Sequence, residues 1–466
     1  MKKIITTMFL SVILIIATIG FTSASGNVPY EEHKTEAQLA EEMRIYGGQT
    51  KAEFEARGEI MAKSAKGVFN EFLDKYTDDQ YGGLWFDDEG YMNIYLLEES
   101  KALESKSLKS KAKIAEQKSM VSKNENVKVH YGKYSLAELD DAKEEISTLL
   151  SSKAHLFHAY TLSANESMNR VFIQLPIAFR DSNDKDIVAL RNQLEDMDIV
   201  AVTYTQEMDD MPTLEEMLFV NYIRSEDNAI HAEDEDIQEI PIVSKGLQAS
   251  YNVWLGMPVE GPKFYYNGEL VSNKFSLGYA TKDKYGTIGW ITAGHPLATS
   301  DPVYHWSNGA KMGTCSHSIY DPDKHPEYDL AFVVLENHGN TWIPKGAGNF
   351  SGDSINNGVN LSGSDKWIKL GLQTCIEGRG GHTYGVILDK SFEVRVSGKL
   401  LTDRIKYSNN SWQGHSGGTV WTYEPDEGHK TTIVAINNGG VPGEYAFGTN
   451  VKYVKKVYGG GQLYTE

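Results

Sequence analysis

Residues 413–421 read "QGHSGGTVW", a serine between glycines with a strand-like run behind it. Ser416 is therefore a candidate nucleophile for covalent catalysis. Residues 414–418 also match G-x-S-x-G, the nucleophile elbow of esterases, which requires a helix after the serine and a later histidine. The following "TVWTY" favours a strand, and the only later histidine is His429 in a polar turn. The sequence thus disfavours an esterase elbow.

A base and an acid that suit a serine nucleophile both occur upstream. "GWITAGHP" places His295 at the end of an apolar strand, and "EYDLAFVVLE" places Asp329 at the start of another. A carboxylate in such an apolar setting is costly unless something pairs with it. Taken alone, each residue has a structural interpretation as a turn histidine, a strand-end cap or a turn serine. Their order and settings together predict a triad of His295, Asp329 and Ser416.

At 466 residues the chain is too long for one core, so more than one domain is expected. We predict residues 245–466 to be all-β, because short apolar runs there alternate with Gly, Asn, Asp and Ser. Residues 25–125 are mainly helical in pattern. Residues 126–206 have the order β-α-β-β-α-β of a split βαβ (ferredoxin-like) unit, with a capping box that begins at Ser135.

The net charge of −19 also divides the chain, because residues 25–240 hold 44 acidic and 23 basic side chains. Neither part is basic enough to indicate nucleic-acid binding. The stretch "RSEDNAIHAEDEDIQEIP" has seven carboxylates, one arginine and little apolar content. We expect residues 207–244 to form an acidic linker in which activation cleavage occurs.

The chain opens with "MKKIITTMFLSVILIIATIGFTSASG", two lysines, an apolar run and then small residues. This order predicts a secretory signal peptide at residues 1–24 and hence a secreted, extracellular protein. A membrane anchor is the alternative, but the run is short for about 30 Å of hydrocarbon, so no stable membrane insertion is expected. An exported protein permits a disulfide between Cys315 and Cys375, and the sequence leaves their pairing open.

These motifs resemble those of chymotrypsin-like serine proteases, above all the bacterial proenzyme branch of alpha-lytic protease and the streptogrisins. "TAGHP" is similar to that family's "TAGHC", "DLAFV" to "DIAVV" and "GHSGG" to "GDSGG". "GGVP" is similar to a segment of the glutamyl endopeptidases. The likeness covers about residues 250–460, whereas the preceding region matches the family only in architecture.

The resemblance implies two six-stranded barrels with the triad in the cleft between them. It implies acyl transfer by Ser416, with His295 as base and Asp329 orienting the imidazole. The N–H groups of Gly414 and Ser416 would form the oxyanion hole, and no metal or cofactor would be needed. A folded pro-region would act inside the chain as inhibitor and folding aid, since a two-barrel protease has many non-local contacts and folds slowly.

The chain departs from the family pattern beside the nucleophile. His415 replaces the usual aspartate, and Ile376 stands where the bacterial branch has the arginine that pairs with it. We therefore expect the oxyanion loop to be held by another contact, from His415 to a backbone carbonyl or a carboxylate. Asn438 stands where the family has a serine beside the triad aspartate.

The substrate pocket is expected around residues without a negative charge, which argues against a trypsin-like preference. Glutamyl endopeptidases carry a histidine where this chain has Asn437, so a preference for acidic residues is not predicted either. The pocket residues named by the resemblance are Asn410 at its base, Ser411, Trp412, Asn437, Asn438, Gly439 and Gly440.

The sequence therefore favours a secreted serine endopeptidase, made as a proenzyme and acting as a monomer on protein or peptide substrates. Two alternatives stay open. One is a catalytically inactive, protease-like binding protein. The other is a G-x-S-x-G esterase.

Overall fold

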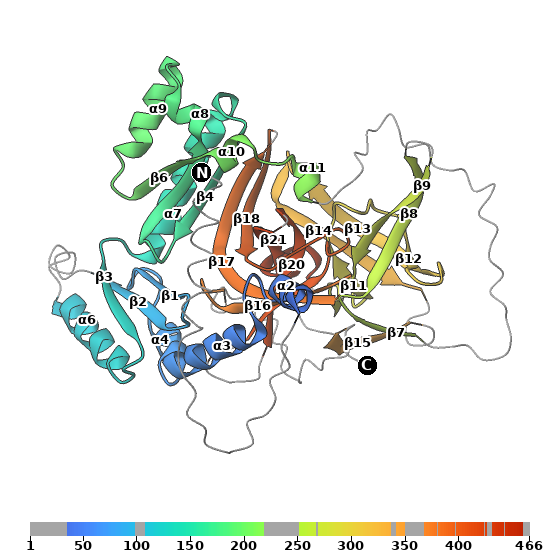
Figure 1. Cartoon of the computed structure of the whole chain (residues 1–466), viewed down its shortest axis with the longest axis horizontal. Helices are drawn as coiled ribbons and strands as arrows, with labels where there is room; N and C mark the ends of the chain where they lie inside the picture. Colours follow the sequence, from blue (N-terminus) through green and yellow to red (C-terminus); the bar gives the residue numbers. More distant parts are fainter. Residues whose placement is uncertain are drawn as a thin grey trace. The chain divides into compact units, whose positions relative to one another are not determined.

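The computed structural model of the chain (Figure 1) describes residues 35–97, 108–218, 251–266, 269–336, 342–349, 368–379, 381–396, 398–423, 425, 431–441 and 443–459. The chain divides into two compact units, 1–40 and 41–466, and the features below belong to the second. Within it we call residues 41–218 the N-terminal region and residues 251–459 the C-terminal region. The expected signal peptide and residues 219–244 of the expected linker lie outside the described residues.

The N-terminal region mixes helices with two small groups of strands. Its elements are α2 (Glu36–Ile45), α3 (Lys51–Ala65), α4 (Phe69–Lys75), β1 (Gly83–Phe86), β2 (Met92–Leu97), α6 (Leu108–Val121), β3 (Lys128–Gly132), α7 (Leu136–Ser152), η1 (Ala154–Leu156), β4 (Ala159–Asn165), β5 (Arg170–Pro176), α8 (Ile177–Asp181), α9 (Lys185–Glu195), β6 (Val200–Thr205), α10 (Gln206–Asp209) and α11 (Leu214–Met217). The predicted capping box at the start of α7 is confirmed, because the Ser135 hydroxyl accepts from the Glu138 N–H and the Glu138 carboxylate accepts from the Ser135 N–H.

The predicted split βαβ unit is wrong in its sheet, although its elements occur in the predicted order. Its first strand, β3, pairs in parallel with β2 and so joins β1 and β2 in a separate three-stranded sheet. The remaining strands pair as β4-β5-β6. The physical reason is that two other edges compete for these strands. The β1–β2 hairpin offers an open edge to β3, and β4 pairs with a strand of the C-terminal region.

The C-terminal region is almost entirely β. Its elements are β7 (Tyr251–Leu255), β8 (Pro258–Tyr266), β9 (Glu269–Ser276), β10 (Ala280–Lys282), β11 (Ile288–Thr292), β12 (Pro302–His305), β13 (Lys311–Asp321), β14 (His325–Leu335), β15 (Trp342–Asn349), β16 (Gln373–Gly378), β17 (Gly381–Val396), β18 (Lys399–Tyr407), β19 (Thr419–Tyr423), β20 (Thr431–Val441), β21 (Tyr445–Asn450) and α12 (Lys452–Tyr458). The all-β prediction for this part of the chain holds in the described residues, apart from α12.

The first sheet of this region has the order β10-β11-β14-β13-β12-β8-β9. Among the described strands no pairing joins its outer members, β10 and β9, so it is a half-barrel and not the closed six-stranded barrel expected. The residues that connect β9 to β10 bond to other segments instead. Leu277 exchanges backbone hydrogen bonds with Gly256 and Met257, and the Gly278 N–H donates to Ile291.

The second sheet does close. Its strands follow the order β16-β19-β20-β21-β18-β17, and β17 pairs back onto β16 to complete a six-stranded ring. Strand β17 is longer than its neighbours, and its far end pairs with β4, so β4-β5-β6 continue the same sheet. In Figure 1 the green strands of the N-terminal region accordingly stand beside the orange β17 and β18.

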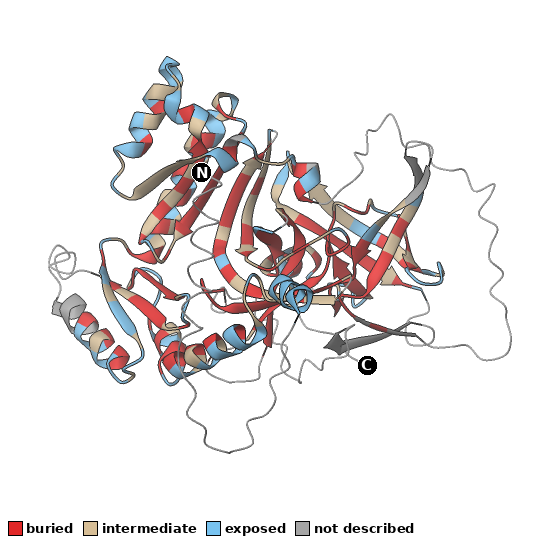
Figure 2. Ribbon diagram, in the orientation of Figure 1, coloured by how far each residue is buried: buried red, intermediate tan, exposed pale blue. Residues whose placement is uncertain are grey.

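Buried residues concentrate on the central strands of the second sheet, as Figure 2 shows for β20 and β21. One hydrophobic cluster fills this ring and continues into the N-terminal region. It joins Ile376, Ile405, Val420 and Val434 of the ring to Phe69, Phe72, Phe86 and Ile94 of the N-terminal helices and hairpin. The two regions therefore share a core.

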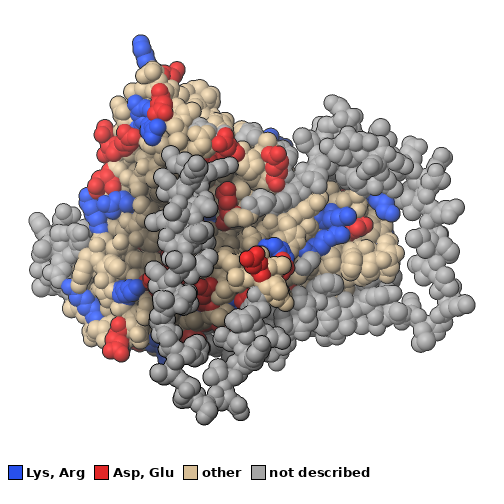
Figure 3. All heavy atoms as spheres, viewed as in Figure 1, with Lys and Arg blue, Asp and Glu red and all other residues tan. Residues whose placement is uncertain are grey.

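Charged side chains of both signs are interspersed on the face shown in Figure 3. In the described part of the chain, no helix combines the length and the apolar character needed to cross a bilayer.

Candidate active site

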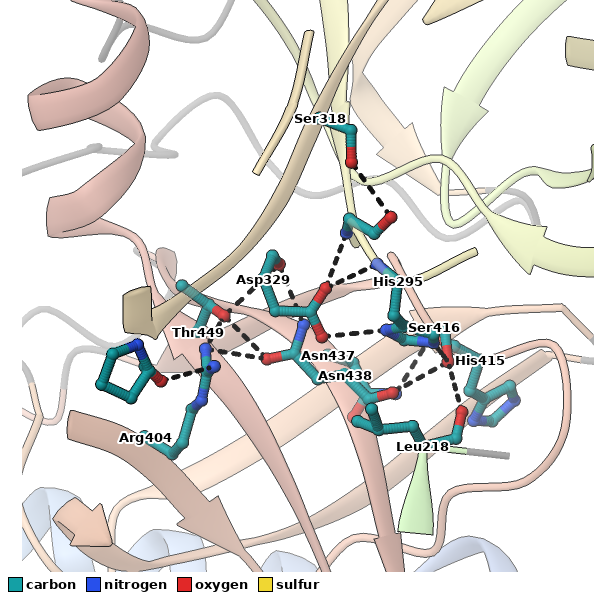
Figure 4. A network of polar contacts seen from close by, with 12 residues as sticks. Leu218, His295, Ser318, Asp329, Arg404, His415, Ser416, Asn437, Asn438 and Thr449 are labelled. Atoms are coloured by element: carbon teal, nitrogen blue, oxygen red, sulfur yellow. Dashed lines mark hydrogen bonds and ion pairs between the residues drawn. The ribbon is translucent and has the colours of Figure 1, made fainter. Parts of the chain in front are cut away.

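The structure brings the three predicted triad residues into one hydrogen-bonded line (Figure 4). The Asp329 Oδ2 atom lies 2.9 Å from His295 Nδ1, and His295 Nε2 lies 3.1 Å from Ser416 Oγ. These contacts join residues that are 34 and 121 positions apart in sequence. They have the geometry in which an imidazole can accept the serine proton while a carboxylate fixes its orientation.

The strands around the triad explain this arrangement. His295 follows β11, and Asp329 lies on β14, which pairs with β11 through Thr292 and Ala331. Ser416 precedes β19, which begins at Thr419. A strand after the nucleophile is incompatible with an esterase elbow, which needs a helix there.

Backbone amides and charge keep the Asp329 carboxylate ionised. The N–H groups of Gly294 and His295 donate to Asp329 Oδ1 at 2.7 and 2.8 Å. Burial by itself raises the pKa of Asp329, but the charge and hydrogen bond of His295, aided by Arg404, outweigh it and hold the pKa below its usual value. The carboxylate is thus suited to stabilise a positive charge on the imidazole.

A buried polar layer lies behind Asp329, and Asn438 is the member of it that the sequence predicted to lie beside this aspartate. The Asn438 side-chain amide donates to the Asp329 carbonyl at 3.1 Å, and its Oδ1 accepts from Thr449 at 2.8 Å. The guanidinium of Arg404, fully buried on β18, donates to Asn438, Thr449 and the Pro326 carbonyl. Asn438, predicted as a pocket residue, therefore directs its side chain to the triad aspartate.

The hydroxyl of Ser416 has more acceptors than protons. Besides His295, it lies 2.8 Å from the Asn438 carbonyl and 3.5 Å from the Leu218 carbonyl. Ser416 is only 3% exposed. In this arrangement the candidate nucleophile is covered, and several acceptors compete for its single proton.

The cover over Ser416 is the end of the N-terminal region. Residues 207–218, which were expected to begin a linker, instead contain most of α10 and all of α11. They pack tightly, because Leu214, Met217 and Leu218 are buried with Phe392 and Phe447. At Gly439 the approach is so close that an added Cβ would lie 2.1 Å from the Met217 carbonyl oxygen. Because Gly439 has no side chain, the backbone at Met217, the last residue of α11, can pack directly against it.

The loop before Ser416 presents two unused donors. Gly414 has a φ of 98°, a conformation that favours glycine. Within the described part of the chain, neither its N–H nor that of Ser416 meets a hydrogen-bond acceptor. Two unengaged amides beside a nucleophile are what an oxyanion requires.

The contact expected to hold this loop is wrong. The His415 ring is buried, and neither nitrogen makes a hydrogen bond to a carbonyl or a carboxylate. Two other side chains hold the loop. The Ser276 hydroxyl donates to the Gly414 carbonyl at 2.7 Å, and the Asn437 side-chain amide donates to the His415 carbonyl at 3.1 Å. A neutral network replaces the charged contact because Ile376, on the facing strand, is buried and apolar.

The remaining pocket residues divide into two groups. Asn437 links the pocket to the barrel, because its amide donates to Ser411 Oγ at 3.1 Å and its Oδ1 accepts from the Tyr407 hydroxyl at 2.7 Å. Gly439 and Gly440 lie beside it on β20. The indole of Trp412 lies against the His415 ring and so belongs with the oxyanion loop.

The structure also bears on metals and disulfides. Cys315 and Cys375 are buried and unlinked, which answers the question that the sequence left open. Within the described residues no three His, Cys, Asp or Glu side chains group closely enough to hold a metal ion.

Comparison with known proteins gives fold matches only. No family model and no curated protein matches the chain. Among solved structures, a Nocardiopsis protease (19% identity) and Thermobifida fusca protease A (20% identity) each match over 46% of this chain and 100% of their own, with TM-scores of 0.35. A Cellulomonas bogoriensis chymotrypsin matches with 22% identity, a TM-score of 0.34 and the same coverage. These matches are to bacterial serine proteases of the chymotrypsin fold.

Proposed function

We propose that the chain is a secreted serine endopeptidase, made in a latent form, that cleaves peptide bonds through an acyl-enzyme. The observation that carries the proposal is the continuous line of contacts from Asp329 through His295 to Ser416. Three residues widely separated in sequence meet at hydrogen-bonding distance, in an arrangement that fits nucleophilic catalysis.

The reaction follows from these contacts. Ser416 Oγ attacks the carbonyl carbon of the scissile peptide while His295 Nε2 accepts its proton, and the carbonyl oxygen becomes an oxyanion. His295 then gives that proton to the leaving amine, the C–N bond breaks, and an ester on Ser416 remains. Water attacks the ester by the same route in reverse, which releases the carboxylic acid and restores the hydroxyl. Asp329 stays ionised throughout.

Gly414 and Ser416 supply the oxyanion donors in this proposal. Their N–H groups have no acceptor within the described residues and flank the nucleophile. Losing one such donor typically lowers kcat by about 10²- to 10³-fold.

The N-terminal region acts here as inhibitor and folding aid. Leu218, which follows α11, contacts Ser416, and the region shares an apolar core with the closed ring of the second sheet. Its other junction, β4 against β17, brings charged side chains of the C-terminal region into contact with it, such as Lys390, which bonds to Glu166 at 3.0 Å. Charges on an edge strand are tolerated when that edge is later exposed to water. These features support a region that is cut away, and the acidic composition of 224–241 supports cleavage between about 225 and 250.

Labelling with a fluorophosphonate tests the proposal, because the reagent phosphonylates only an activated serine. The full chain would be compared with the same chain after trace cleavage by an added protease, each as wild type and as Ser416→Ala. We expect fast labelling after cleavage, labelling at least about tenfold slower before it, and none in Ser416→Ala. An unlabelled, cleaved wild type would identify an inactive protease-like protein.

A matched pair of acyl substrates then separates the peptidase from an esterase. We expect the cleaved chain to hydrolyse a peptide amide as well as the corresponding ester. Hydrolysis of the ester alone contradicts the assignment.

A further inference from the structure

The imidazole of His415 lies in the loop that carries the proposed oxyanion donors, yet it is poorly hydrogen-bonded. The residue is 0% exposed, and neither ring nitrogen has a hydrogen bond of ordinary geometry. Burying a polar group that makes no good hydrogen bond is unfavourable. If the side chain contributes to the loop beside Ser416, it does so by packing and not by hydrogen bonding.

The ring packs against two neighbours instead. The Trp412 ring lies with its centroid 3.8 Å from that of His415 and is tilted by 42° to it. Gly378, at the end of β16, also approaches the imidazole, because an added Cβ there would sit only 3.0 Å from His415 Cδ2. The imidazole is therefore in close contact with an indole and with a bare stretch of backbone.

The indole of Trp412 is itself fixed in place. Its Nε1 donates to the Arg379 carbonyl at 3.2 Å. The Arg379 N–H in turn donates to Ser276 Oγ at 2.7 Å, and Ser276 also bonds to the Gly414 carbonyl. The contact between Trp412 and His415 and the hydrogen bonds of Ser276 thus act on the same short loop.

The N-terminal region adds an outer layer. The guanidinium of Arg44, on α2, lies 4.3 Å above the Trp412 ring, and the Arg44 carbonyl accepts from Asn410 Nδ2 at 2.6 Å. This layer is present only while that region stays attached, whereas Trp412, His415 and Gly378 all belong to the C-terminal region.

Burial also determines the charge state of the ring. It lowers the pKa of His415 to about 3, and the Arg379 backbone only partly opposes this shift. The ring is therefore neutral at any pH at which the chain would work. Ile376, which stands where the resemblance implies the partner of an ion pair, is buried and apolar, so it supplies no charge to such a pair.

We propose that Trp412 and His415, packed closely together and against Gly378, are positioning residues that hold the oxyanion loop by uncharged packing, in place of an ion pair. The inference rests on the proposed function, because its consequence is the aim of the Gly414 and Ser416 N–H groups at a substrate carbonyl. In this proposal, position 415 requires a planar ring that fits beside Trp412 and the Gly378 backbone.

Three variants of the cleaved chain test this role through kcat and KM for a peptide substrate. We expect His415→Ala to lower kcat about 10²-fold and to change KM less than about twofold, because only transition-state donors are misplaced. His415→Phe keeps a planar ring and should recover most of that loss. Gly378→Ala should lower kcat by pushing the ring, whereas Gly261→Ala, where the nearest atom is 3.5 Å away, should not.

A stability control separates positioning from general damage. Val434→Ala removes a buried side chain of the same ring of strands, and it should lower Tm without changing kcat. The proposal is overturned if folded His415→Ala keeps the wild-type kcat, or if His415→Phe is as impaired as His415→Ala. A wild type that neither labels with fluorophosphonate nor hydrolyses peptide refutes the proposed function itself, which is a different result.

Discussion

Two of the junctions between the N-terminal region and the C-terminal region are of opposite character. At the edge junction, β4 pairs with β17, and buried charges cross the boundary between the regions. Glu393 accepts from the hydroxyls of Ser147 and Tyr160 at 2.7 and 2.8 Å, and Lys390 bonds to Glu166. Charged groups of this kind regain water when the junction opens, so its net contribution to attachment is small.

The core junction is apolar and close-packed. Ile368, Leu372 and Ile387 lie in the same cluster as the aromatic side chains of α4 and the β1–β2 hairpin. Backbone bonds reinforce it, since the Phe86 N–H donates to the Leu370 carbonyl at 2.9 Å and Arg57 donates to the Gly371 carbonyl at 2.7 Å. Opening this junction exposes apolar surface to water, at a free-energy cost of about 25 cal/mol for each Å² exposed.

The contrast suggests an order of events within the proposed activation. The edge junction separates at little cost and would open first. The core junction joins the closed ring of the second sheet to the N-terminal region, the proposed folding aid, and would open last. Substitutions that weaken one junction at a time test this order.

The largest effect is expected from leaving a charge unpaired at the edge junction. Glu166→Gln removes the partner of Lys390, and both side chains are buried. We expect the free energy of unfolding of the full chain to fall by about 3–5 kcal/mol in urea titrations. Glu116→Gln, at an exposed pair with Lys75, is the control and should change little. Adding Lys390→Met to Glu166→Gln should restore most of the loss, and failure to do so would mean that the pair is not what Glu166 supplies.

A somewhat smaller effect is expected at the core junction. Gly371 has a φ of 77°, and an added Cβ would lie 1.9 Å from the Phe86 carbonyl oxygen. Gly371→Ala should therefore destabilise the full chain by about 3 kcal/mol, through backbone strain and the forced separation from β1. Gly398 has a φ of 78° and nothing within 4 Å, so Gly398→Ala measures the strain alone. Equal losses in the two variants would show that the contact with Phe86 is unimportant.

The smallest effect is a pH dependence of the edge junction. Burial raises the pKa of Asp389 to about 6, although the Ser391 N–H, the Ser163 hydroxyl and the charges of Lys143 and Lys406 favour its ionised form. A carboxyl whose pKa is raised on folding contributes stability at low pH that is lost as the pH rises from about 4 through 6. Asp389→Asn should remove this loss and stabilise the full chain by about 2 kcal/mol at pH 7. Unfolding measured between pH 4 and 8 checks this, and an unchanged pH slope would contradict it.

Features that depend on contacts between residues close in sequence could be predicted from the sequence, and those that depend on distant contacts could not. His295, Asp329 and Ser416 were predictable because each lies in a local pattern, a strand end or a glycine turn, that limits where its side chain can point. The capping box at Ser135 was predictable for the same reason, since its partner lies three residues away. The helix-rich and β-rich parts followed from their different hydrophobic periods.

Predictions that depended on which edge pairs with which were less successful. Strand β3 has the pattern of a strand, but nothing in its own residues says that it joins β2 rather than β5. The acidic composition around 207–244 does not reveal that Leu214, Met217 and Leu218 have an apolar surface to bury against. The support given by Arg404 to Asp329 links positions 75 residues apart and leaves no local trace.

The sequence alone determined the chemical groups of the site and the period of the strands that carry them, because both are properties of neighbouring residues. Tertiary structure alone decided what covers Ser416, what holds the oxyanion loop and how the two regions share a sheet and a core. Those outcomes depend on competition between distant surfaces for burial and for open strand edges. A free edge or an apolar face accepts any partner that fits, so its occupant is decided only when the whole chain has folded.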